Sequence, residues 1–257
     1  MAFGGGTSRG PLHGTRTSGF RPSALFGGGL KGVWYDPSDL STVWQDSART
    51  TPGAVNSPVG CIDDKSGNGA NATQATAGSR PILRQAGSLF YLEFDGVDDF
   101  LATAAINFSA RDEVSVFAGV RKTSDVANQV IVENTTGAGS FRLYVPAAGT
   151  GYTHGMTGSL SSDSTATGFA APATSVVTGL GKISTDQNII RVNGAQRASA
   201  ATDQGTGNMG NFILYIGRRD GTSLPFAGNL YGLLVVGALV ADPLRTENWL
   251  NGKTGAF

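Results

Sequence analysis

Short stretches of alternating apolar and polar residues run through the chain from Lys31 to its end. Residues 140–146 place three apolar side chains on one face and leave Arg142 and Tyr144 on the other. A period of two is the pattern of a β-strand with one buried face. The sequence therefore predicts many short strands. The clearest of them occupy residues 89–94, 100–104, 113–121, 140–146, 175–183, 188–194, 211–219 and 226–239.

Turn residues separate these strands. The pairs Asn193-Gly194 and Asp220-Gly221 are typical of tight hairpin turns, because both residues of such a pair tolerate a positive φ. Strands that follow one another without intervening helices predict an all-β fold, a two-sheet antiparallel sandwich.

One helix is expected, at the C-terminal end. Asp242 is a suitable N-cap, Pro243 suits the first helical turn, and Trp249 and Leu250 provide an apolar edge. Gly252 is expected to end this helix.

The first 30 residues have a composition of their own. They contain nine glycines and three arginines but no acidic residue, and such a segment is expected to be extended when it has no partner. Its scattered large apolar residues predict an arm, 1–30, that becomes ordered on a partner, followed by one domain, 31–257. A disordered tail of no consequence is the alternative. The expected anchoring residues are Phe3, Arg9, Leu12, Arg16, Phe20, Arg21 and Phe26.

Charge is scarce in this chain of 257 residues. Lys plus Arg and Asp plus Glu number 19 each, so the net charge is zero, and charged residues make up only 15% of the chain. A balanced chain lacks the positive field expected of a nucleic-acid-binding protein. The low charge also predicts a surface that neighbouring subunits partly cover.

The single cysteine, the hydropathy profile and the N-terminus bear on disulfide formation, membrane insertion and secretion. Cys61 excludes an intrachain disulfide and is expected to be a buried, unreactive residue. There is no apolar run of about 18 residues, so membrane insertion is not expected. The N-terminus lacks the apolar core of a secretory signal, so synthesis in the cytoplasm is expected.

The stretch FDGVDD places Asp95, Asp98 and Asp99 within five residues, between two predicted strands. Asp-Gly favours a tight turn, since the Asp side chain binds nearby backbone amides and Gly accepts a positive φ. Neighbouring aspartates of one turn cannot face each other across a substrate, as a catalytic carboxylate pair must. We interpret the three aspartates as turn residues. Calcium, which prefers several carboxylate oxygens, is the alternative; otherwise no cofactor is expected.

The remaining candidate motifs are weak. The glycines of DDKSGNGANATQ, residues 63–74, do not precede a helix as in a phosphate-binding loop, so a polar loop packed on the sandwich is expected. His13 and His154 lack the spacing of a metal site, and no G-x-S-x-G motif indicates a serine hydrolase. No catalytic residue and no metal ligand is therefore assigned.

Several segments together resemble a known family. They are WYDPSDLSTVWQDS at 34–47, DDKSGNGANATQATAGSRP at 63–81, YLEFDGVDDFLAT at 91–103 and IGRRDGTSLPFAGNLYGLLVVGALV at 216–240, followed by the short helix. This order is similar to that of the concanavalin A-like, laminin-G-like jelly-roll domains of tailed-phage virion proteins. The resemblance covers residues 31–257 and leaves out the arm. It implies a jelly-roll sandwich on a virion surface, in a tail fibre, head spike or decoration protein that often binds host glycans.

Glycan binding requires an aromatic face for the C–H groups of a sugar and planar polar groups around it. Outward-facing strand positions and nearby loops offer six such residues. They are Arg142, Tyr144, Tyr152, His154, Arg191 and Tyr215. Tyr152 and His154 are expected in a glycine-bounded loop. Each of the six could equally be an exposed side chain of a solvated sheet.

Together these features predict a non-enzymatic structural protein of the virion surface that is anchored to other virion proteins by residues 1–30 and contacts host-surface glycans. A glycan-degrading enzyme on the same fold is the alternative, with Glu93, Glu113, Glu133 and Asp186 as scattered carboxylates. A cytoplasmic protein unrelated to viruses is a third hypothesis.

A homo-oligomer is expected. Particle surface proteins usually lie on symmetry axes, and loops rich in Ala, Thr, Ser and Gly, such as residues 158–174, suit a subunit interface. A trimer is the first expectation and a pentamer the second.

Overall fold

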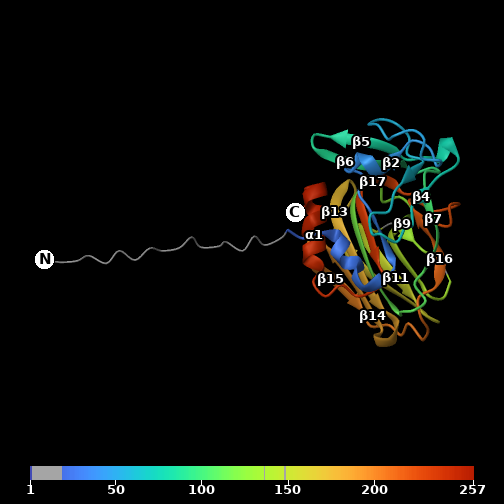
Figure 1. The fold of residues 1–257 in the computed structure, drawn as a ribbon. Helices are drawn as coiled ribbons and strands as arrows, with labels where there is room; N and C mark the ends of the chain where they lie inside the picture. The colour runs from blue at the N-terminus through green and yellow to red at the C-terminus, as the bar shows by residue number, and fades with distance from the viewer. Residues whose placement is uncertain (2–18, 136, 148) are drawn as a thin grey trace.

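Two antiparallel β-sheets face each other in the computed structural model, which describes Met1 and residues 19–135, 137–147 and 149–257 (Figure 1). One sheet has eight strands and the other nine, and a single α-helix follows the last strand. The predicted all-β sandwich with a short C-terminal helix is confirmed.

The eight-stranded sheet consists of β1 (Gly32–Tyr35), β5 (Ile82–Ala86), β6 (Leu89–Asp95), β8 (Glu113–Lys122), β13 (Ala173–Lys182), β14 (Gln187–Val192), β15 (Ala195–Ala200) and β17 (Ala227–Val236). Its order is β15-β14-β13-β8-β17-β6-β5, with β1 paired to β17. The long central strands β8, β13 and β17 are buried over almost their whole length, because both faces of this sheet are covered.

The nine-stranded sheet consists of β2 (Val43–Trp44), β3 (Cys61–Ile62), β4 (Ala72–Thr73), β7 (Leu101–Asn107), β9 (Gln129–Glu133), β10 (Ser140–Val145), β11 (Gly151–Thr157), β12 (Ser161–Thr167) and β16 (Asn211–Ile216). Its order is β12-β11-β10-β9-β16-β7-β4-β3-β2. In Figure 1, β7 and β16 lie on the side of the molecule opposite the helix.

The sequence alternation determines which side chains enter the core. Phe141, Leu143 and Val145 of β10 lie in the core between the sheets, at most 1% exposed, whereas Arg142 and Tyr144 lie on the outer face. This is the arrangement that the period-two pattern predicts. The hairpin at Asn193-Gly194 is also confirmed, since both residues have positive φ, 53° and 76°.

Two strands lie where loops are expected from the sequence. The segment around Tyr152 and His154 forms β11, and residues 161–167 form β12. The inner positions of β12 are Ser162, Ser164 and Ala166, all buried. Small polar residues on the inner face hide the alternation of apolar and polar residues by which a strand is recognised.

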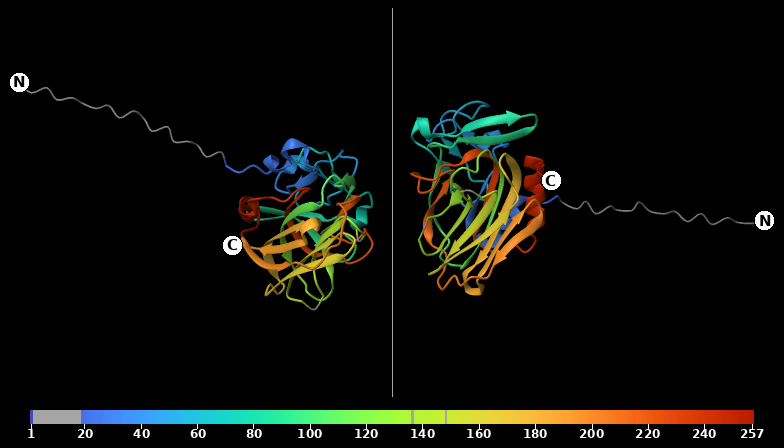
Figure 2. Two further views of the ribbon diagram at one scale, coloured as in Figure 1. Left: turned by 90° about the horizontal axis from the view of Figure 1, so that it is seen from below. Right: turned by 180° about the vertical axis from the view of Figure 1, so that it is seen from behind.

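Helix α1 (Pro243–Thr254) covers the outer face of the eight-stranded sheet (Figures 1 and 2). Leu250 and Trp249 pack with Phe117, Val176 and Leu234 in a second apolar cluster there. The helix begins as predicted, but it ends later: Gly252 lies inside it. Gly255 is the residue in the left-handed conformation, with its N–H bonded to the Asn251 carbonyl.

A 3-10 helix, η1 (Pro22–Gly29), packs beside β1, so the second half of the predicted arm contacts the sandwich. Phe26 is only 8% exposed and its ring lies over Gly32, where a Cβ would be 2.9 Å from a ring carbon. Shorter 3-10 helices are η2 (Leu40–Thr42), η3 (Ala77–Ser79) and η4 (Ile183–Thr185). None of the helices in the described ranges is long and apolar enough to cross a bilayer.

Candidate functional site

The outer face of the nine-stranded sheet carries a row of polar and aromatic residues on neighbouring strands. Tyr215 of β16 is in register with Glu133 of β9, which in turn is in register with Arg142 of β10. The row continues through Gly155 of β11 to Asp163 of β12. Strands of a sheet are about 4.8 Å apart, so the five positions lie along one line across the sheet.

Three side chains hold each other at one end of this row. Nη2 of Arg142 lies 3.2 and 3.1 Å from the two carboxylate oxygens of Asp163. The Tyr144 hydroxyl donates to Asp163 Oδ2 at 3.0 Å, and the Arg142 guanidinium lies over the Tyr144 ring, 4.7 Å from its centre. A guanidinium fixed in this way presents its remaining N–H groups without further loss of side-chain freedom.

Gly155 makes this contact between β10 and β12 feasible. A Cβ at this position would lie 2.7 Å from both Arg142 Nε and Asp163 Oδ1. Because β11 has no side chain here, the arginine and the aspartate meet across an intervening strand. We refer to Arg142, Tyr144 and Asp163 as the arginine cluster.

Glu133 lies in the middle of the row and is fully buried, 0% exposed. Arg219 Nε is 3.3 Å from its Oε2, and the backbone N–H of Asp220 donates to Oε1 at 3.1 Å. Burial raises the pKa of the Glu133 carboxyl, and Arg219 opposes that shift. Glu133 therefore fixes the 219–220 turn against the sheet rather than facing a ligand.

A hollow of about 260 Å³ adjoins Tyr215 at the other end of the row. Pockets for drug-sized ligands usually start near 300 Å³, so this one suits a single small ring or substituent. We call it the Tyr215 hollow. Its lining residues are Ala105, Asn134, Thr135, Asn211, Phe212, Ile213, Tyr215 and Asp220.

Three of the six predicted ligand-binding residues therefore share this face: Arg142, Tyr144 and Tyr215. The sequence prediction missed Asp163, because β12 was expected to be a loop. It also missed Asn134 and Gly155; Gly155 was expected in the same glycine-bounded loop as Tyr152 and His154. The only available signal was the alternation in 161–167, where Asp163 and Thr165 are outward-facing members of a strand made of small residues.

The other three predicted residues cannot take part in a site on this face. Tyr152 and His154 are 0% exposed and lie inside the sandwich, because both are inner positions of β11. His154 Nδ1 is 2.8 Å from the Asn188 Oδ1, and burial lowers its pKa to about 4. Arg191 lies on the other sheet, where it binds both carboxylate oxygens of Glu247 in α1, at 2.7 and 2.9 Å.

The anchoring residues predicted in the arm divide into two groups. Phe3, Arg9, Leu12 and Arg16 lie outside the described residues. Of the others, Arg21 is exposed and Phe20 is half-buried. Phe26 packs into the domain itself and is only 8% exposed. Anchoring by the arm stays a prediction.

The three aspartates of FDGVDD form a turn, as predicted. Asp95 Oδ1 accepts the backbone N–H groups of Val97 and Asp98, and the Asp95 N–H donates to Asp99 Oδ2 at 3.0 Å. Ser79 donates to Asp98 at 2.7 Å. One carboxylate oxygen from each of the three lies within 4.8 Å of the others, and calcium stays the untested alternative.

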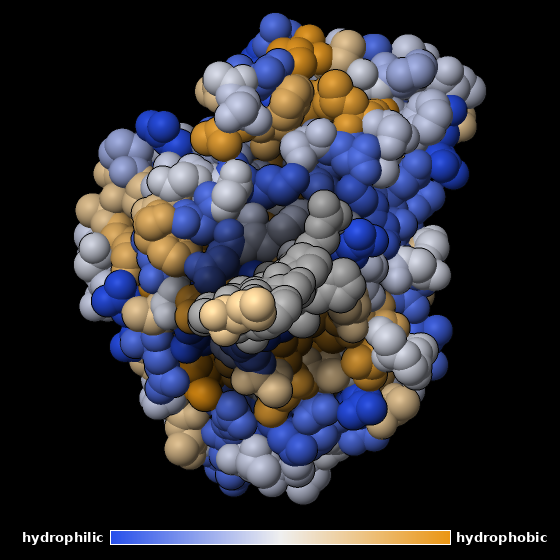
Figure 3. Space-filling model, turned by 60° about the vertical axis from the view of Figure 1, so that its left-hand side comes forward, coloured by the Kyte–Doolittle hydropathy of each residue, from blue (hydrophilic) through white to orange (hydrophobic). Residues whose placement is uncertain are grey.

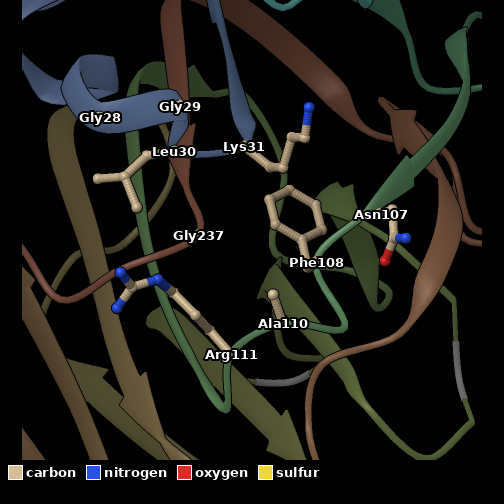
Figure 4. Close-up of a pocket in the computed structure, with 9 residues that line it drawn as sticks. All are labelled: Gly28, Gly29, Leu30, Lys31, Asn107, Phe108, Ala110, Arg111 and Gly237. Atoms are coloured by element: carbon tan, nitrogen blue, oxygen red, sulfur yellow. The ribbon is translucent and has the colours of Figure 1, made fainter.

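A second, smaller hollow of about 130 Å³ lies between the end of η1 and the chain after β7 (Figure 4). It contains two basic residues, Lys31 and Arg111, and the ring of Phe108. The two cationic side chains are exposed and point in different directions in Figure 4, and Arg111 is bound to Glu113 at 3.1 Å. We assign no ligand to this hollow.

Figure 3 looks at the α1 side, where apolar residues form separate patches among hydrophilic ones.

Cys61 is buried, and burial raises the pKa of its thiol to about 12, so it is unreactive as expected.

Comparison with known proteins identifies a fold and no family. No family model and no curated protein sequence matches the chain. Among solved structures, the chain is similar to botulinum neurotoxin type C, with a TM-score of 0.58 and 10% identity over 86% of this chain and 51% of that one. Cell entry of that neurotoxin depends on interaction with two ganglioside molecules.

Two further structures give the same result. The binding domain of botulinum neurotoxin serotype D/C is similar with a TM-score of 0.59 and 10% identity, over 87% of this chain and 52% of that one. The binding domain of botulinum neurotoxin DC in complex with SialylT gives 0.57 and 11%, over 85% and 53%. The chain spans about half the length of these proteins. At such low identity the likeness establishes the fold, a two-sheet β-sandwich.

Proposed function

We propose that this protein is a non-catalytic carbohydrate-binding module whose ligand lies on the outer face of the nine-stranded sheet. The observation that carries the proposal is the row from Tyr215 to Asp163, which has an aromatic ring at one end and the arginine cluster at the other, on either side of the buried Glu133.

The chemistry of this row suits a glycan. Sugar rings present C–H groups on one face, which favour an aromatic ring, and hydroxyl groups at the edge, which favour charged donors and acceptors. Tyr215 and Tyr144 supply the rings, while Arg142 and Asp163 supply the donors and acceptors. The arginine cluster is already ordered without a ligand, so binding loses little side-chain entropy there.

The similar structures support this proposal without deciding it. The neurotoxin domains that share the fold are described with gangliosides and with SialylT, which places carbohydrate recognition among the uses of this sandwich. Fold alone does not assign a function, so the argument depends on the row itself.

We further propose that the module belongs to a virion surface, as a tail fibre, head spike or decoration protein in oligomeric form. The sequence resemblance over residues 31–257 supports this, as does the glycine-rich, acid-free composition of the chain before η1. We propose residues 1–21, which precede η1, as the attachment segment.

Glycan binding can be tested with the full chain on an array of bacterial surface oligosaccharides, followed by titration of the best ligand. Arg142→Ala and Tyr215→Ala are each expected to weaken binding about tenfold or more, since each removes a central contact. Arg121→Ala is the matched control, because Arg121 is exposed on the other sheet.

Two outcomes would overturn the proposal. The first is that no glycan binds, and the second is that binding survives both substitutions on the nine-stranded face. Release of reducing sugar from a bound oligosaccharide would instead favour the glycan-degrading alternative.

A further inference from the structure

We propose that the Tyr215 hollow takes the acyl group of an N-acetylated sugar, so that the module prefers N-acetylhexosamine-containing glycans. This inference rests on the proposed function and adds the class of sugar. It depends on three features of the hollow: its apolar wall, an unpaired amide nitrogen, and a carboxylate at its rim.

The wall of the hollow is apolar where it meets solvent. Ile213 is 38% exposed, Ala105 is exposed, and Phe212 is half-buried. These side chains lie on β16 and β7, directly beside Tyr215. A sugar hydroxyl gains nothing from such a wall, whereas a methyl group loses unfavourable contact with water when it packs there.

Asn134, which also lines the hollow, holds a donor that lacks a partner. Its Oδ1 accepts the backbone N–H of Phe141 at 2.8 Å, which fixes the orientation of the amide. Its Nδ2 is buried and donates to no group among the described residues. A buried donor without an acceptor is unfavourable by about 1–3 kcal/mol, so a ligand that supplies an acceptor is favoured.

Asn134 is 0% exposed, so Nδ2 lies behind the wall of the hollow and an acceptor reaches it only where the lining side chains move apart. This restricts which acceptor can bind there. A ring hydroxyl brings a bulky ring with it, whereas the carbonyl oxygen of an acetyl group lies on a small substituent. The acetyl methyl group would meet Ile213 as the carbonyl oxygen approaches Asn134. One substituent thus satisfies both the apolar wall and the unpaired donor.

The rim distinguishes an amide from an ester. Asp220 lines the hollow and is exposed, and its backbone is fixed by the bond of its N–H to Glu133. Its carboxylate can accept the N–H of an acetamido group, which an O-acetyl group lacks. Thr135 lies beside it with a φ of 138°, a backbone conformation that β-branched residues rarely adopt and that is concentrated at functional sites.

The inference can be tested by NMR spectroscopy on the full chain with methyl glycosides of N-acetylglucosamine, N-acetylgalactosamine and glucose. The N-acetylated sugars are expected to bind about tenfold more tightly than glucose, from one buried methyl group and one hydrogen bond. Saturation transfer should be strongest at the acetyl methyl protons. The Asn134 side-chain amide signals should shift with these sugars and stay in place with glucose.

Variants of the wall provide the control. Ile213→Ser is expected to bring the ratio of affinities close to one, whereas Leu244→Ser, which changes a similarly exposed aliphatic residue on α1, should leave the ratio unchanged. An O-acetylated glucoside that binds as tightly as N-acetylglucosamine would contradict the role of Asp220.

The possible failures are distinguishable. If N-acetylated and plain sugars bind equally and Arg142→Ala weakens both, the preference for acetamido groups is wrong and the carbohydrate-binding proposal stands. If none of the sugars and no glycan of the array binds, both fail.

Discussion

Asp99 is a buried carboxylate in a turn whose other two aspartates are more exposed. It is 6% exposed, and its Oδ2 accepts the Asp95 N–H. Burial, together with the neighbouring carboxylates of Asp95 and Asp98, raises its pKa from 3.8 to about 6, against the effect of that hydrogen bond. The folded protein therefore holds a proton on Asp99 more tightly than the unfolded chain does.

This shift predicts a pH-dependent effect of Asp99→Asn. The stability that Asp99 contributes is complete below about pH 4 and falls as the pH rises through 6. The variant stays neutral, so it is expected to gain about 1–2 kcal/mol relative to the wild type between pH 4 and pH 7. Chemical denaturation at both pH values measures this difference. The exposed Asp203→Asn serves as the control, and a gain that is equal at both pH values would contradict the prediction.

At the residue scale, the sequence predicted positions on regular strands and failed where small polar residues face inward. Arg142, Tyr144 and Tyr215 could be placed because apolar residues mark the opposite face of β10 and β16. Tyr152 and His154 could not, because β11 pairs with a strand whose inner side chains are Ser162 and Ser164. Hydropathy carries no signal when both faces of a strand are polar.

At the element scale, an ion pair as well as apolar packing holds α1 against the eight-stranded sheet. Glu247 is only 1% exposed, and both its oxygens bind Arg191 of β14. The sequence predicted the start of α1 from Asp242 and Pro243. It did not predict this pair, because nothing local indicates which strand a helix covers.

Arg191→Ala is expected to lower the free energy of unfolding by about 3 kcal/mol, because it leaves a buried carboxylate without a partner. Replacing both residues by methionine should restore most of that loss. Arg245→Ala is the control: Arg245 is bound to Asp242 at 3.0 Å, but both side chains are more than half exposed. It should change the stability by less than about 1 kcal/mol. Equal losses for the two alanine variants in denaturant titrations would show that the buried pair has no special role.

At the scale of the whole molecule, one sheet is covered on both sides, whereas the outer face of the other is open except where the 219–220 turn covers Glu133. Helix α1 and η1 lie on the eight-stranded sheet, while the outer face of the nine-stranded sheet carries the row from Tyr215 to Asp163. The sequence predicted the sandwich but placed the domain boundary at residue 31. A short glycine-rich stretch looks like an arm in composition, although Phe26 and Pro22 are buried.

Two deletion variants distinguish the residues needed for attachment from the residues needed for the stability of the domain. Removing residues 1–19 is expected to leave the thermal stability unchanged while abolishing incorporation into particles. Removing residues 1–30 should also lower the stability by about 3 kcal/mol, because it takes Phe26 away from Gly32 and β1. Calorimetry and particle sedimentation measure the two effects. A shorter deletion that still joins particles would contradict the attachment role, and equal stability of both proteins would contradict the boundary.

The chain leaves the folded domain beside η1, on the layer that α1 covers, whereas the open face lies on the opposite layer (Figure 1). Copies tethered through that end would all turn their open faces away from the support. Weak contacts to single sugars would then act together on a surface coated with repeated glycans, because each bound copy raises the effective concentration of the next. Avidity of this kind requires no deep pocket in any one subunit, in keeping with the shallow hollows of this domain.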